Sequence, residues 1–388
     1  MLASCIPCGF ARSTVSQVLG MMLLLLLQIT LTSAPASAQS ITLPTIEPSI
    51  RLEASGHFGQ NELDGQLRRP DQISKIRSRA AAGSARDEFL MGYACTKGMG
   101  QPQDLSQALA WYLKAANHAE PAAITELGRM YVHGYGVSQD YQKGMEWLRR
   151  AAADGYAPAQ TDVGLLYFEG LGVAPDYESA VRWWEKAAGN GYAPAESNLG
   201  VAYLNGMGVP RDPARATQLF RNAADAGLDT AQFDLASCYE AGQGVPQDLG
   251  VAAEWYRKAA QRGNPGAQNN LASMYQSGRG VPQDTFRALR LFLLAAENGN
   301  MKAATNLATT FQLGIGVKPD SVLSCMWLQI ASGAGEDGGE SVHATCSKIS
   351  DHQLNQAREQ ASTWRVQHHL EVVPSTAASS ASRIFSPR

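Results

Sequence analysis

A seven-residue connector, Gly-x-Gly-Val-x-x-Asp, returns along this chain at a fixed interval of 36 residues and constrains the fold more than any other feature. The connector is first complete at Gly134, Gly136, Val137 and Asp140. Seven repeats fill residues 84–335 without an insertion. A strict period of this size predicts a solenoid in which each repeat packs on its neighbours. The connector acids are Asp104, Asp140, Asp176, Asp212, Asp248, Asp284 and Asp320.

Each repeat divides into two predicted helices, which makes the fold class all-α. In the second repeat, the first helix (residues 122–133) places Leu127, Gly128 and Tyr131 on one face, because spacings of three and four residues match a helical stripe. The second helix of that repeat covers residues 141–153. It carries Trp147, Leu148, Ala151 and Ala152.

The position of Gly128 holds only glycine or alanine in all seven repeats. Helix propensity alone favours alanine by about 1 kcal/mol, so a glycine here indicates tight packing. We expect the two helices of a repeat to cross closely at this position, with large residues of the Trp147 column and small residues of the Ala151 column alternating along the contact. The small residues are Gly92, Gly128, Gly164, Gly200, Ala236, Ala272 and Ala308.

The connector has a structural role in this scheme. Its two glycines supply positive-φ positions that end the first helix, and its valine is expected to reach the core. Its aspartate caps the second helix by accepting from unpaired amides and by complementing the helix dipole. A further glycine closes the second helix of six repeats, at Gly155, Gly191, Gly227, Gly263, Gly299 and Gly335.

The first 38 residues have the organisation of a signal peptide. Arg12 is followed by an apolar run over residues 18–31 and by Ala36-Ser37-Ala38 before Gln39. An uncleaved anchor is the alternative, but this run is shorter than the roughly 20 residues that span a bilayer. We therefore expect export to the periplasm or the medium, with no stable membrane span after cleavage.

The remaining segments flank the repeats. Residues 39–69 are rich in proline and glycine and are predicted to form a flexible linker, and residues 70–83 to form a capping helix. Residues 336–371 are predicted to form C-terminal capping helices, since Ser350 and Gln353 have capping-box spacing. Residues 372–388 lack a core-forming run and are expected to be disordered.

Four cysteines follow the predicted signal peptide. Cys95 and Cys238 occupy columns that hold large apolar residues in other repeats, so both are expected to be core thiols. Cys325 and Cys346 bracket the junction between the last repeat and the segment that covers it. An oxidising compartment would permit a disulfide between them, and two unpaired thiols are the alternative.

Composition and motif spacing argue against several functions. The chain has 32 Lys and Arg against 35 Asp and Glu, so it has no basic footprint for nucleic acid. The seven histidines have no zinc-like spacing, and an acid that recurs once per repeat does not form a catalytic pair at one centre. The Gly-x-Gly pairs lack the third glycine and the preceding strand of a phosphate loop. We expect no cofactor, no metal and no catalytic residue.

The full repeat pattern resembles the Sel-one-like repeat, a relative of the tetratricopeptide repeat. This resemblance implies a right-handed α-solenoid that scaffolds protein complexes or binds protein segments, and exported bacterial members include envelope assembly factors and proteins acting on host cells. Gly144 stands where the family usually has alanine. The pattern is carried in the second repeat by Ala123, Leu127, Gly128, Tyr131, Gly134, Gly136, Val137, Asp140, Trp147, Ala151, Ala152 and Gly155.

The resemblance also indicates where a partner would bind. First helices of tetratricopeptide-like repeats line the concave face, and residues there that differ between repeats are able to specialise. The leading hypothesis is a non-enzymatic exported scaffold that binds a protein or peptide there. The alternatives are a secreted host-interaction factor and a cell-wall or β-lactam hydrolase, although the paired cysteines of hydrolase-like relatives are missing. Candidate residues are Phe89, Tyr93, Arg129, His133, Leu165, Phe168, Asn205, Phe233, Glu240, Asn269, Gln276 and Gln312.

Overall fold

The computed structural model describes Asp64, Leu67 and residues 70–333 and 339–368. Every regular element in this part of the chain is an α-helix. The predicted signal peptide, nearly all of the predicted linker, the C-terminal tail and Gly335 lie outside the described residues. The helices divide between two compact units, one ending at Arg262 and the other beginning at Gly263.

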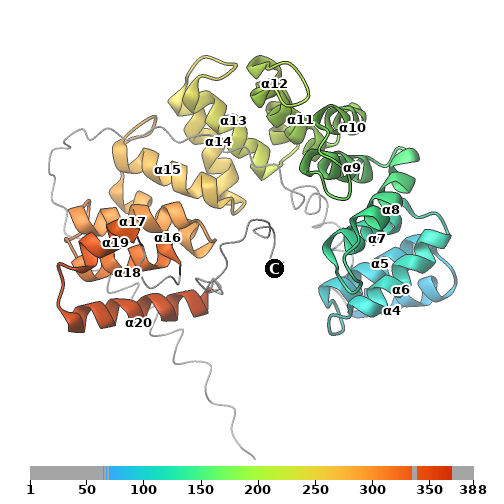
Figure 1. Cartoon of the computed structure of the whole chain (residues 1–388), viewed down its shortest axis with the longest axis horizontal. Coiled ribbons are helices and arrows are strands. Elements are labelled where there is room, and N and C mark those ends of the chain that lie inside the picture. The colour runs from blue at the N-terminus through green and yellow to red at the C-terminus, as the bar shows by residue number, and fades with distance from the viewer. Residues whose placement is uncertain (1–63, 65–66, 68–69, 334–338, 369–388) are drawn as a thin grey trace, which may run out of the picture. The chain divides into compact units, whose positions relative to one another are not determined.

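In the part that the structure describes, the N-terminal unit has a capping helix followed by five helix pairs (Figure 1). Both helices of each pair have 13 residues, as a strict repeat requires. The helices are α4 (Pro70–Ala81), α5 (Ala85–Lys97), α6 (Leu105–Asn117), α7 (Pro121–His133), α8 (Tyr141–Ala153), α9 (Ala157–Glu169), α10 (Tyr177–Gly189), α11 (Ala193–Asn205), α12 (Pro213–Asp225), α13 (Asp229–Ala241) and α14 (Leu249–Gln261).

The C-terminal unit contains the last two helix pairs and two helices that follow them. The capping box predicted at Ser350 and Gln353 is present at the start of the final helix. The helices are α15 (Pro265–Ser277), α16 (Thr285–Glu297), α17 (Met301–Leu313), α18 (Ser321–Ser332), α19 (Gly339–Cys346) and α20 (Asp351–Gln367).

The connector residues have the roles that their chemistry predicts. Gly134 is left-handed with φ of 74° and ends α7, and Gly136 is left-handed as well. The Asp140 carboxylate accepts a hydrogen bond from the Lys143 amide at 3.0 Å and so begins α8. The same two features recur at every connector.

The close crossing of paired helices is also confirmed, but the large residue is one position later than expected. A Cβ added at Gly128 would lie 2.5 Å from Leu148, because this leucine fills the contact. Leu148 is fully buried, whereas Trp147 is only half-buried and stacks beneath the Arg150 guanidinium. The amphipathic pattern that predicted a core position for Trp147 is therefore also compatible with a half-buried tryptophan at the edge of the helix contact. The large core residues of the first six second helices are Tyr112, Leu148, Trp184, Phe220, Tyr256 and Phe292, whereas in α18 the residue of the Trp147 column, Trp327, is itself buried.

The second glycine of a connector can lie against the preceding repeat, as Gly136 and Gly172 do. A Cβ at Gly136 would be 2.8 Å from Leu105 Cβ, and one at Gly172 would be 2.7 Å from Tyr141 Cβ. Leu105 and Tyr141 each begin the second helix of the previous repeat. The glycine thus serves both the turn and the packing of neighbouring repeats.

Helices cover both ends of the described array. At the N-terminal end, Ile73, Ile76 and Ala80 of α4 are buried, and the Ile73 side chain lies against Gly100. Packing of α4 on α5 therefore covers an apolar surface that the first repeat would otherwise expose.

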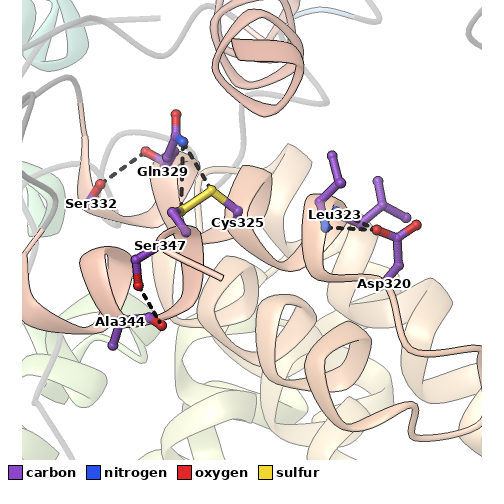
Figure 2. Close-up of a disulfide and its surroundings, with 9 residues drawn as sticks. Asp320, Leu323, Cys325, Gln329, Ser332, Ala344 and Ser347 are labelled. Carbon is purple, nitrogen blue, oxygen red and sulfur yellow. Dashed lines mark hydrogen bonds between the residues drawn. A yellow bond between two sulfur atoms is a disulfide. The ribbon is translucent and has the colours of Figure 1, made fainter. Parts of the chain in front are cut away.

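At the C-terminal end, α19 and α20 pack against α18. A disulfide joins Cys325 to Cys346 (Figure 2). The rings of Trp327 and Trp364 meet edge to face with centroids 5.3 Å apart, and Arg365 donates to the Gly333 carbonyl at 2.8 Å. This end of the last repeat is therefore held by covalent, aromatic and polar contacts.

Candidate protein-binding face

The first helices of the repeats follow one another along one side of the N-terminal unit. This side, formed by α5, α7, α9, α11 and α13, is called the first-helix face below. Each of these helices after α5 packs against the second helix of the preceding repeat. Side chains on this face that differ between repeats are the candidates for binding.

The candidate residues of the first repeat are largely buried. Phe89 and Tyr93 are 4% and 5% exposed, and the Tyr93 hydroxyl donates to Asp64 at 2.8 Å. Burial and the Asp64 carboxylate raise the pKa of Tyr93. Asp64, which precedes α4 in the chain, therefore contacts this part of the face.

Three aromatic candidates lie at the edge of the core. Each ring packs against the large core residue of the second helix in its own repeat. Phe168 and Phe233 remain half-buried, whereas Phe89 is buried. The contacts join Phe89 to Tyr112, Phe168 to Trp184 and Phe233 to Tyr256, with ring centroids 5.9, 5.5 and 5.7 Å apart.

Arg129 is the centre of a charge cluster that joins two successive first helices. Its Nε donates to Asp162 Oδ2 at 2.7 Å and its Nη1 donates to Glu126 Oε1 at 2.7 Å. The Asp162 side chain is fully buried, while 16% of the Arg129 side chain is exposed. Burial acts to lower the pKa of Arg129, but the two carboxylates outweigh it and raise this pKa well above its ordinary value.

The acid partner of Arg129 belongs to a polar column that sequence analysis missed. Six consecutive repeats have an acid or an amide at the position of Asp162, and the same 36-residue register would have revealed them. This column lies two residues before the small Gly or Ala of each repeat, as Asp162 does before Gly164. Its members are Glu126, Asp162, Asn198, Asp234, Asn270 and Asn306.

A second polar cluster lies within the fifth repeat. The Tyr256 hydroxyl donates to Glu240 Oε2 at 2.9 Å and lies 3.0 Å from Ser237 Oγ. Glu240 is 7% exposed. The aromatic ring of Tyr256 thus fills the core while its hydroxyl satisfies an acid on the first-helix face.

The remaining candidates of the N-terminal unit fall into three environments. Leu165 is fully buried and belongs to the core. His133 is half-buried and stacks on Tyr135, with ring centroids 5.1 Å apart. Asn205 is exposed at the end of α11, and its amide donates to the Val201 carbonyl at 2.9 Å.

In the C-terminal unit the candidates form amide and hydroxyl contacts between α15 and α17. Asn306 donates to Asn269 Oδ1 at 2.8 Å, and Gln276 donates to Thr310 Oγ1 at 3.0 Å. Asn269 is buried, whereas Gln312 is exposed. The side-chain pairs thus change from charged in the N-terminal unit to amide and hydroxyl in the C-terminal unit, as the residue types in the sequence do.

Within the described ranges, no three His, Cys, Asp or Glu side chains come together as a metal-binding group. The same part of the chain contains no helix with the length and apolarity to cross a membrane.

The geometry defines a helical-repeat protein with a polar, non-uniform first-helix face. The family model of the Sel1 repeat matches seven consecutive segments, and the chain belongs to this family. Proteins of this family act as scaffolds for protein–protein interaction. The matched residues are 85–119, 121–156, 157–192, 193–228, 229–264, 265–300 and 302–336.

A solved Sel1 repeat structure shows the same fold, and a second solved structure is similar in sequence. A Sel1 repeat protein from Oxalobacter formigenes is 32% identical, with a TM-score of 0.57, over 63% of this chain and 96% of that one. The protective antigen c5321 of uropathogenic Escherichia coli, which displays an SLR fold, is 26% identical over 87% of this chain and all of that one, with a TM-score of 0.42.

A curated relative is the chitin synthase regulator SKT5 of Malassezia restricta. It is 33% identical over 70 residues, which are 18% of this chain. The chain spans only 5% of the length of that protein, so the similarity concerns a short run of repeats.

Proposed function

We propose that this chain is an exported, non-enzymatic scaffold that binds a segment of another protein along its first-helix face. The observation that carries the proposal is the contrast between the two kinds of position. The connector residues and the small-residue columns of Gly128 and Ala151 repeat almost unchanged, whereas the first-helix face carries different groups in each repeat, including the Arg129 cluster and the Glu240 cluster. The solenoid frame requires none of these groups.

The energetics support the same function. Burying a carboxylate costs stability unless it is paired, and apolar residues at these positions would satisfy the fold. Groups that are costly to the fold and differ between repeats favour recognition of a partner with a particular order of side chains. Export rests on the organisation of residues 1–38.

Photocrosslinking in the native cells tests the proposal. A photoreactive amino acid is placed at Phe168 or Asn205 on the first-helix face, and at Glu146 as a matched control on the exposed side of α8. We expect the two face positions to crosslink the same protein and the control position not to do so. Crosslinking of the same protein at similar yield from Glu146, or of none from either face position, would contradict the proposal.

Fractionation of the same cells tests export. The mature chain is expected in the periplasm or the medium, with an N-terminus near Gln39 in mass spectrometry. A full-length chain that remains in the cytoplasm would contradict export while leaving the binding experiment valid.

A further inference from the structure

Asp234 on α13 is a buried acid without a hydrogen-bond partner among the described residues. Its side chain is 3% exposed, and neither carboxylate oxygen accepts a hydrogen bond from any residue that the structure describes. Burial, with a smaller contribution from the charge of Asp229, raises the pKa of Asp234 to about 7. A buried acid without a partner destabilises the folded state, so its presence calls for an explanation.

The chain itself shows what fits at this position. Asp162 occupies the same place two repeats earlier, 72 residues before Asp234, and it binds Arg129 of the preceding first helix. Part of the Arg129 side chain remains exposed. A cation beside this acid position therefore extends from the buried carboxylate to the boundary with solvent.

The equivalent cation is missing next to Asp234. The residue that corresponds to Arg129 is Val201 on α11, and it is buried and apolar. α9 and α13 occupy the same place in their repeats. Both helices carry the acid, but the residue in the position of its partner Arg129 has no side-chain donor next to Asp234. The nearby Asp229 adds negative charge on the same helix, which also favours a cation at this place.

We propose that the Asp234 carboxylate receives a lysine or arginine side chain of the bound protein segment, between α11 and α13, where Arg129 lies between α7 and α9. This inference rests on the proposed function and specifies the chemistry of the partner. The segment carries a basic residue that forms a charge-assisted hydrogen bond with Asp234. Binding then supplies the pair that the fold leaves incomplete.

Selection from a library of random displayed peptides on the purified full chain tests the inference. The wild-type protein is expected to enrich peptides with Lys or Arg at one fixed position. Asp234→Asn removes the negative charge, and Val201→Arg supplies the cation from within the chain. Both variants are expected to lose the preference, whereas Glu146→Gln on the exposed side of α8 should retain it.

A selected peptide is then compared with a copy in which methionine replaces its basic residue. The replacement should weaken binding to the wild-type chain by about tenfold or more, since a hydrogen bond to a charged group is lost, and should leave binding to Asp234→Asn unchanged. Circular dichroism establishes that each variant is folded. If Asp234→Asn does not fold, Val201→Arg still tests the inference.

The possible outcomes separate the two proposals. Enriched peptides without a basic residue, or the same preference in Val201→Arg, would overturn the role of Asp234 while supporting binding by the first-helix face. No enriched peptide with any variant would contradict the proposed function and this inference together.

Discussion

Arg129 on α7 and Asp162 on α9 form an ion pair between successive repeats, with Nε and Oδ2 2.7 Å apart and the acid fully buried. The pair is buried enough for its two charges to depend on each other. It is also incomplete, because Arg129 Nη2 has no hydrogen-bond partner among the described residues.

Asp162→Asn should lower the free energy of unfolding by about 3–5 kcal/mol, because it leaves a buried guanidinium without its main counter-charge. The double variant Arg129→Met with Asp162→Leu should recover most of this loss, since replacing both charges by apolar groups is often neutral. Urea unfolding followed by circular dichroism measures both. A double variant that is less stable than Asp162→Asn would contradict the account.

Asp234 should make stability depend on pH in the opposite sense to a paired acid. An unfolded aspartate ionises near pH 3.9, whereas the pKa of Asp234 in the folded chain is about 7. Between these values the unfolded chain has released a proton that the folded chain still holds. The Asp234 contribution therefore lowers the free energy of unfolding as pH rises, by up to about 1.4 kcal/mol per pH unit, and levels off above pH 7.

The measurement is the difference in unfolding free energy between the wild type and Asp234→Asn from pH 4 to pH 8. The variant lacks the titrating group, so its free energy of unfolding should rise steadily relative to that of the wild type as pH rises. Parallel pH curves for the two proteins would show that Asp234 ionises normally in the folded state.

Ala119 occupies a backbone conformation that glycine occupies in the later repeats. Its φ is 57°, and its counterpart one repeat later is Gly155 with φ of 82°. Ala119→Gly should raise the free energy of unfolding by about 1 kcal/mol, because a left-handed conformation strains a residue with a Cβ. Gly155→Ala is the matched control and should lower it by a similar amount, since no atom lies near an added Cβ there. A lower free energy of unfolding for Ala119→Gly, with a higher one for Gly155→Ala, would contradict the backbone explanation.

The disulfide between Cys325 and Cys346 should stabilise the C-terminal unit. Its cysteines are separated by 21 residues, a loop for which chain entropy predicts about 3 kcal/mol. A Cys325→Ser and Cys346→Ser variant should therefore expose α19 to proteolysis and hydrogen exchange. Cys95→Ser is the control, because Cys95 is buried but not in a disulfide. Unchanged exchange in α18–α20 would indicate that the aromatic and polar contacts suffice.

The repeat pattern predicted the helices and their ends because each boundary has a local cause. Gly134 and Asp140 act through their own backbone and the nearest amides, so their roles follow from residue type and spacing. The sequence did not reveal that Leu148 rather than Trp147 fills the core, because these two adjacent apolar positions lie within one helical stripe. Only the depth of packing against Gly128 distinguishes them.

The contacts of the first-helix face were harder to predict. Pairing of Arg129 with Asp162 depends on how two helices from different repeats approach, and a single repeat contains no information on that geometry. Burial of Leu165 and Tyr93 has the same origin. The variable columns are visible in sequence, but which members are core, paired or exposed depends on the neighbouring repeats.

The position of Gly136 against Leu105 has a consequence for how such a chain can change during evolution. Each repeat carries both halves of its joint, a glycine for the repeat before it and a helix start for the repeat after it. Duplication of one 36-residue segment would therefore supply a complete new joint and leave the old ones intact. Residues on the first-helix face would move apart by one whole repeat, so the spacing of recognised side chains can lengthen in equal steps without redesign of the core.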